Sequence, residues 1–149
     1  MNESKHNAVV VAESILGKKL PEDVLENANK KFQEYSAGMM ITLELIQQFG
    51  EEDLLKGYRI CGTGTIDTDG NIGRIGGLKM KLIASDKLHE KKEERKFNYF
   101  FVPKVQFPTA IKIAETEGLE IDIVPIENIS EALEFLNNLV PKPWLINEE

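Results

Sequence analysis

The sequence predicts an α/β fold, of the α+β kind, with a mixed sheet, a central buried helix and βαβ units in its second half. The stretch 36–50, SAGMMITLELIQQFG, is apolar on most sides, which is typical of a buried helix. In the second half, strand-like runs alternate with helical patterns, and this alternation indicates parallel strands joined by right-handed crossovers. At 149 residues the chain is long enough to form one domain with its own core.

The elements follow in order along the chain. A helix is predicted over 4–18, closed by Gly17, and the polar stretch 21–33 is predicted to be helical or irregular. Asp69-Gly70 is a hairpin signal between the strand-like runs 58–66 and 72–75. The remaining predictions are a helix over 78–88, a buried strand over 97–103, a helix over 109–117 that ends at Gly118, a strand over 119–126 and a helix over 130–139 that opens at Ser130.

Composition excludes several classes of function. A net charge of −7 argues against nucleic acid as a partner, because binding phosphates requires a basic surface. Cys61 is the only cysteine, so an internal disulfide or a cysteine zinc site cannot form. His6 and His89 are too far apart in sequence to suggest a histidine metal cluster, and we expect no metal and no cofactor. The apolar run 9–12 is too short for a signal peptide or a membrane span, so we expect a cytoplasmic protein, or part of a membrane-tethered one if the sequence is a fragment.

A glycine-rich stretch, GTGTIDTDGNIGRIGGLKMK, spans residues 62–81. It lacks the Gly-Lys pair of a phosphate-binding loop, because Leu78 follows Gly77. It also lacks the third glycine of a dinucleotide fingerprint, since Asp67 stands at that position. A calcium loop would need one more acidic position before Gly70. The pattern instead predicts a strand, a hairpin and a Gly-Gly step into a helix.

That helix carries two lysines, Lys79 and Lys81. Successive helical residues are rotated by about 100°, so two lysines separated by one residue point in different directions. We therefore expect at most one of them to face a site.

The motifs, taken together, resemble the proteolytic domain of the Lon protease family, most closely the Lon-like members without an ATPase. The order is Ser-Ala-Gly at Ser36, then GTGTID, then G-x-I-G-x-I-G-G-x-x-x-K ending at Lys81. The resemblance is strongest over 36–139 and includes IDIVPIENISEALEFL near the end. It implies that residues 1–149 form a single Lon-like proteolytic domain with a shortened, divergent part over 1–35.

The resemblance also implies a catalytic Ser-Lys dyad. Ser36 matches the nucleophile, Lys81 the general base and Thr63 a threonine that orients the amine. A serine hydroxyl needs such a base to become a nucleophile, and an apolar site lowers the pKa of a lysine, so that its neutral amine can accept the proton. Backbone N–H groups at the start of the central helix could stabilise the oxyanion. We expect the helix of Lys81 to pack against Met39–Ile41, and the site to be shaped by small residues, namely Ala37, Gly38, Gly76 and Gly77.

The function that follows is hydrolysis of a protein or peptide substrate by a homo-oligomeric peptidase without its own ATPase, so that any ATPase partner is a separate chain. An alternative stays open, in which a catalytically impaired Lon-like domain serves as a protein-binding or assembly module. It depends on Glu34-Tyr35, which stand where the family places a glycine with proline or another small residue, and on Gln33, which replaces a common aspartate.

Overall fold

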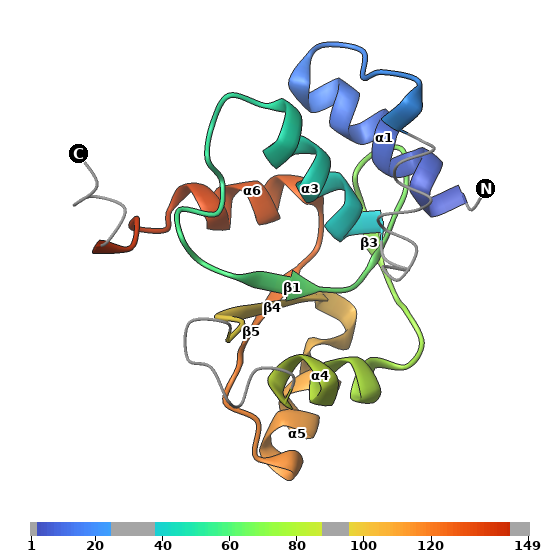
Figure 1. Ribbon diagram of the computed structural model, residues 1–149. Coiled ribbons are helices and arrows are strands. Elements are labelled where there is room, and N and C mark those ends of the chain that lie inside the picture. Colours follow the sequence, from blue (N-terminus) through green and yellow to red (C-terminus); the bar gives the residue numbers. More distant parts are fainter. Residues whose placement is uncertain (1–2, 25–37, 88–95, 144–149) are drawn as a thin grey trace.

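A parallel sheet separates two layers of helices (Figure 1). The computed structural model describes residues 3–24, 38–87 and 96–143. Within these ranges the strands lie in the order β1 (Ile60–Gly62), β4 (Tyr99–Pro103) and β5 (Asp122–Ile126), with both pairings parallel. One face of the sheet carries α1 (Glu3–Leu16), α3 (Gly38–Phe49) and α6 (Ile129–Asn137), and the other carries α4 (Leu78–Lys87) and α5 (Phe107–Glu117). The α/β class and the two βαβ units, β1–α4–β4 and β4–α5–β5, are confirmed.

The central strand β4 is apolar throughout because helices cover both of its faces. Phe101 packs into the core beneath α1, α3 and α6, whereas Phe100 and Val102 pack into the core against α4 and α5. All three side chains are at most 1% exposed. The buried strand predicted over 97–103 is therefore confirmed.

The predicted central helix is α3, which lies between α1 and the sheet. Its buried residues lie on most sides of the helix, and the exposed Gln48 comes only near its end. They are Gly38, Met39, Ile41, Thr42, Leu43, Leu45 and Ile46. Helix α1 is likewise confirmed and stops before Gly17.

The Asp-Gly segment forms the predicted hairpin, which joins β2 (Thr65–Ile66) to β3 (Ile72–Gly73). The carboxylate of Asp67 accepts hydrogen bonds from the backbone N–H groups of Asp69 and Asn71, each at 2.9 Å. These bonds, the one from Asn71 foremost, lower the pKa of Asp67. The Asp67 carboxylate thus organises a turn. In the described ranges, no group of three or more metal-binding side chains occurs.

Several boundaries differ from the prediction. Helix α5 begins at residue 107 and not at 109, and the strands predicted from 97 and 119 begin at 99 and 122. The strand-like run 58–66 is divided into β1 and β2, because the chain leaves the parallel sheet at Thr63-Gly64. Helix α6 begins after Asn128 and not at Ser130. The side chain of Asn128 accepts a hydrogen bond from the N–H of Glu131 at 3.0 Å, which makes it the N-cap.

The expected packing of α4 against Met39–Ile41 is wrong. Leu78 and Leu82 of α4 pack with Phe100, on the side of the sheet opposite to Met39. Helix α4 belongs to the crossover from β1 to β4, and α5 to the crossover from β4 to β5. Because both crossovers move in the same direction across the sheet, right-handed connections place both helices on one face. Any site shared by α3 and α4 must therefore form at the border of the sheet, either along an edge strand or at the ends of the strands.

No helix within the described ranges has the length and apolar character needed to cross a lipid bilayer. The polar stretch 25–33 and the irregular end over 144–149 lie outside the described residues.

Candidate functional site

Lys81 and Thr63 meet at the carboxyl end of β1. The amine of Lys81, in the first turn of α4, donates a long hydrogen bond of 3.4 Å to the hydroxyl of Thr63. Thr63 is only 2% exposed and Lys81 is partly buried. The structure thus places a lysine amine beside a buried hydroxyl, where the resemblance puts a catalytic lysine and its orienting threonine.

Lys79 points elsewhere. Its amine lies 3.7 Å from the carboxylate of Glu117 on α5, and its side chain is 61% exposed. The difference between the two lysines follows from helical geometry, because residues two apart are about 200° apart around the axis. Of the two, Lys81 alone faces Thr63.

The start of α3 lies beside the same pair. The N–H of Met39 donates to the C=O of Gly64 at 3.0 Å, which links the first turn of α3 to the residue after Thr63. Gly38 is buried and is the first residue of α3. Ser36 and Ala37 lie outside the described residues, directly before Gly38 in the sequence.

Gly76 and Gly77 lead into α4 and are both exposed. Gly77 has φ +69°, a left-handed conformation that glycine adopts without strain. A Cβ at either position would meet no atom within 4 Å. These glycines leave open space beside the first turn of α4, in which the N–H of Lys81 donates to the C=O of Gly77 at 3.2 Å.

One polar side chain near the site, Gln106, was not predicted from the sequence. It is the last residue of the 3₁₀ helix η2 (Lys104–Gln106). Its amide exchanges two hydrogen bonds with the backbone of Ile75, just before Gly76. The partners are 31 positions apart, so no local pattern could have paired them. Its position three residues after a buried strand was the only available signal.

Cys61, in β1, carries a thiol that does not suit nucleophilic catalysis. Burial raises the pKa of its thiol to about 12, although a hydrogen bond with Ser85 acts in the opposite direction. The thiol contacts the C=O of Tyr99 at 3.6 Å. Because the thiolate is the reactive form, this thiol is a poor nucleophile near neutral pH.

The same pKa shift predicts how stability depends on pH. The unfolded thiol ionises near pH ~8.5, below the folded thiol, so the stabilising contribution is complete below pH ~8.5 and is lost as pH rises toward the folded pKa. Between pH 8 and pH 10, the wild type should lose roughly 1–2 kcal/mol more free energy of unfolding than Cys61→Ala does. Urea unfolding of both proteins at the two pH values measures this difference. Equal losses would show that the thiol is not shielded in the folded state.

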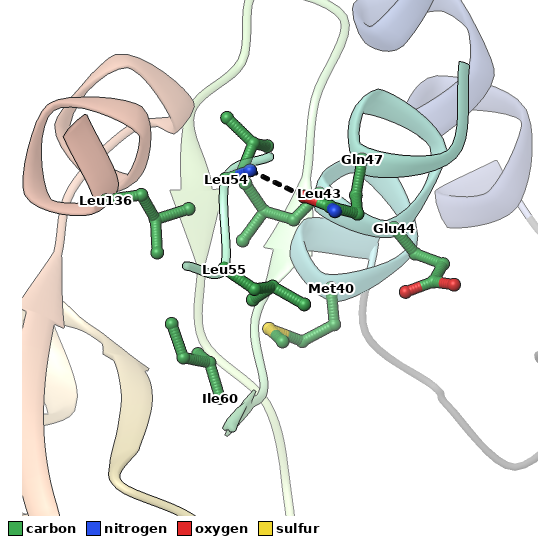
Figure 2. A pocket seen from close by; sticks show the side chains of 8 residues that line it. All are labelled: Met40, Leu43, Glu44, Gln47, Leu54, Leu55, Ile60 and Leu136. Carbon is green, nitrogen blue, oxygen red and sulfur yellow. Dashed lines mark hydrogen bonds between the residues drawn. The ribbon is translucent and has the colours of Figure 1, made fainter. Parts of the chain in front are cut away.

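Two of the hollows on the described surface are lined by residues other than Thr63 and Lys81. The first, of about 60 Å³, lies between α3, the segment 54–60 and α6 (Figure 2). Its lining is mostly apolar, with Glu44 and Gln47 as its polar members: Met40, Leu43, Glu44, Gln47, Leu54, Leu55, Ile60 and Leu136. The second, of about 200 Å³, lies between α4 and α5 and includes Lys79 and Lys112. The polar pair at the end of β1 is therefore distinct from both.

Comparison with known proteins gives a partial match. No protein-family model matches the chain. A Lon protease from Aster yellows witches'-broom phytoplasma (strain AYWB) is 31% identical over 96 residues, which is 64% of this chain. The match covers 11% of that relative, so the chain spans only about a tenth of its length. This similarity suggests a Lon-related family, and the mixed α/β fold is consistent with it.

Proposed function

We propose that this chain is a serine peptidase of the Lon type, in which Ser36 is the nucleophile and Lys81 the general base. The observation that carries the proposal is the 3.4 Å contact between the Lys81 amine and the buried Thr63 hydroxyl, beside the start of α3. The similarity to part of a Lon protease supports it. The protease name of that relative gives no support to the binding-module alternative.

In the proposed reaction, the Lys81 amine takes the proton of the Ser36 hydroxyl as its oxygen bonds to the scissile carbonyl carbon. The tetrahedral intermediate collapses when the C–N bond breaks, and the protonated amine delivers its proton to the leaving nitrogen. A water molecule then attacks the acyl-enzyme, with Lys81 again taking the proton. The C–O bond to Ser36 breaks, Lys81 returns the proton to the Ser36 oxygen, and the product leaves with a new carboxyl group.

Thr63 directs the amine in this scheme. Its hydroxyl accepts one N–H of Lys81, which limits rotation of the amine at the end of a long and flexible side chain. Thr63 can do so because its own position is fixed: it is buried, and its backbone N–H donates to the C=O of Phe101 at 2.9 Å.

The start of α3 supplies the proposed oxyanion site. The helix runs for 12 residues, and the N–H groups at its first turn carry partial positive charge. Small residues at Ala37 and Gly38 would let the substrate carbonyl approach these groups. Gly76 and Gly77 leave space for the substrate on the side of α4.

The proposal extends to partners. The substrate is a protein or peptide and not nucleic acid, and the active form is a homo-oligomer. Residues 1–149 act as one proteolytic domain in the cytoplasm.

The test is acylation of Ser36 by a β-lactone, a probe that modifies nucleophilic serines. We expect peptide mass spectrometry to locate the adduct on Ser36, and Ser36→Ala to reduce labelling to background. Ser14→Ala, which changes an exposed serine of α1, is the matched control and should label like the wild type. Absence of labelling in the folded wild type, or labelling that persists in Ser36→Ala, would contradict the proposal.

A further inference from the structure

Gln106 is a buried side chain whose two polar ends both bind one residue. Its Oε1 accepts from the N–H of Ile75 at 3.0 Å, and its Nε2 donates to the C=O of Ile75 at 2.9 Å. The residue is 7% exposed. Gln106 thus holds Ile75 in the way that a neighbouring strand would, although no strand pairs with Ile75 in the described ranges.

The segment that carries Gln106 also fixes Thr63. The C=O of Phe101, in the middle of β4, accepts from the N–H of Thr63 at 2.9 Å, and η2 follows β4 directly. Residues 101–106 therefore hold Thr63 at one end and Ile75 at the other. These two anchors are independent of the contact between Thr63 and Lys81.

Between Ile75 and α4 lie only Gly76 and Gly77, whose missing side chains leave empty space. Among bonds between described residues, those of Ile75 are the last that tie the backbone to a distant segment before the helix of Lys81. Leu78 and Leu82 bury the apolar face of α4, but apolar contacts are non-directional and permit small shifts of the helix. The paired bonds of Gln106 are directional and restrict such shifts.

We propose that Gln106 is a positioning residue, which sets the placement of the Lys81 amine relative to the Thr63 hydroxyl through Ile75 and the first turn of α4. It touches no reacting atom. The catalytic consequence of this inference rests on the proposed function. If Lys81 is the general base, a displacement of about 1 Å of its amine can lower the rate about a hundredfold.

The chain offers a matched control in Gln47 of α3. Its Oε1 accepts from the N–H of Leu54 at 2.7 Å, and its Nε2 donates to the carboxylate of Asp53 at 3.0 Å (Figure 2 shows the first bond). Gln47 also tethers a loop with both polar ends, but this loop follows α3 and lies beside the hollow of Figure 2. Gln→Met removes two hydrogen bonds at either position and preserves side-chain length.

Two readouts are needed: the rate of Ser36 acylation by the β-lactone, and the NMR resonance of the Lys81 ¹³Cε group, assigned with Lys81→Arg. We expect Gln106→Met to slow acylation by about 10- to 100-fold and to shift the Lys81 resonance. Gln47→Met should stay within about twofold of wild type, since it lies outside the site. Gln106→Glu keeps an acceptor for the N–H of Ile75 and should be intermediate; it carries the test if Gln106→Met fails to fold.

The outcomes separate the two proposals. If the wild type is acylated but neither Gln106 variant differs from Gln47→Met in rate or in the Lys81 resonance, the positioning role is wrong and the proposed function stands. If the wild type is not acylated, yet the Gln106 variants shift the Lys81 resonance and Gln47→Met does not, the positioning role holds and the peptidase proposal is wrong.

Discussion

Replacing Lys81 with methionine is expected to lower the rate of Ser36 acylation by about 10²- to 10⁴-fold, the usual contribution of a positioned general base. Methionine keeps an unbranched apolar stem and removes only the amine that contacts Thr63. The buried hydroxyl of Thr63 then loses its contact with that amine, and the proposed nucleophile loses its proton acceptor. The rate is measured by mass spectrometry of the β-lactone adduct over time.

Lys79→Met is the matched control, because it changes a lysine of the same helix turn that faces away from Thr63. Its ion pair with Glu117 is exposed, and such pairs contribute only about 0–1 kcal/mol. We expect an acylation rate within about twofold of wild type. Equal losses in the two variants, with unfolding midpoints like that of the wild type, would refute the assignment of Lys81 as the base.

Substituting Gly64 with alanine is expected to cost about 3 kcal/mol or more in free energy of unfolding. Gly64 has φ +150°, which residues with a side chain rarely adopt. An added Cβ would lie 2.6 Å from a methyl carbon of Ile72 and 3.4 Å from the side chains of Met39 and Pro103. The change therefore strains the backbone and displaces the side chain of Ile72 in the hairpin, beside the point where the N–H of Met39 donates to the C=O of Gly64. Urea unfolding monitored by circular dichroism gives the value.

Gly76→Ala provides the comparison for Gly64→Ala. A Cβ at Gly76 meets no atom within 4 Å, and its φ lies outside the left-handed region. The expected change is within about 0.5 kcal/mol. A Gly64→Ala protein as stable as Gly76→Ala would show that the backbone at Gly64 accommodates a side chain beside Ile72 without strain.

Most elements of the fold could be predicted because their signals are local. The apolar stretch 36–50 predicted α3, and Asp69-Gly70 predicted the hairpin. The alternation of strands and helices predicted parallel pairing, which the structure shows in the order β1-β4-β5. Boundaries were less accurate where two local signals compete, as at Asn128 and Ser130, both of which are good N-caps.

The candidate site was only partly predictable. The resemblance to the Lon family pointed to Lys81 and not to Lys79, and the structure places Lys81 beside Thr63. Gln106 had no such pattern, since the bond to Ile75 joins segments that come together only in the folded chain. The side of the sheet on which α4 packs was predicted wrongly for a similar reason: an apolar helix face can be buried against either layer.

The sequence by itself determined which segments become helices and strands and which residue types are available for chemistry, because hydrophobic periodicity, turn residues and motif spacing act over short distances. Only the tertiary structure decided that α3 and α4 lie on opposite faces of the sheet and that residues 101–106 hold both Thr63 and Ile75. These features arise from crossover handedness and from hydrogen bonds between distant residues, which are formed only when the chain is folded.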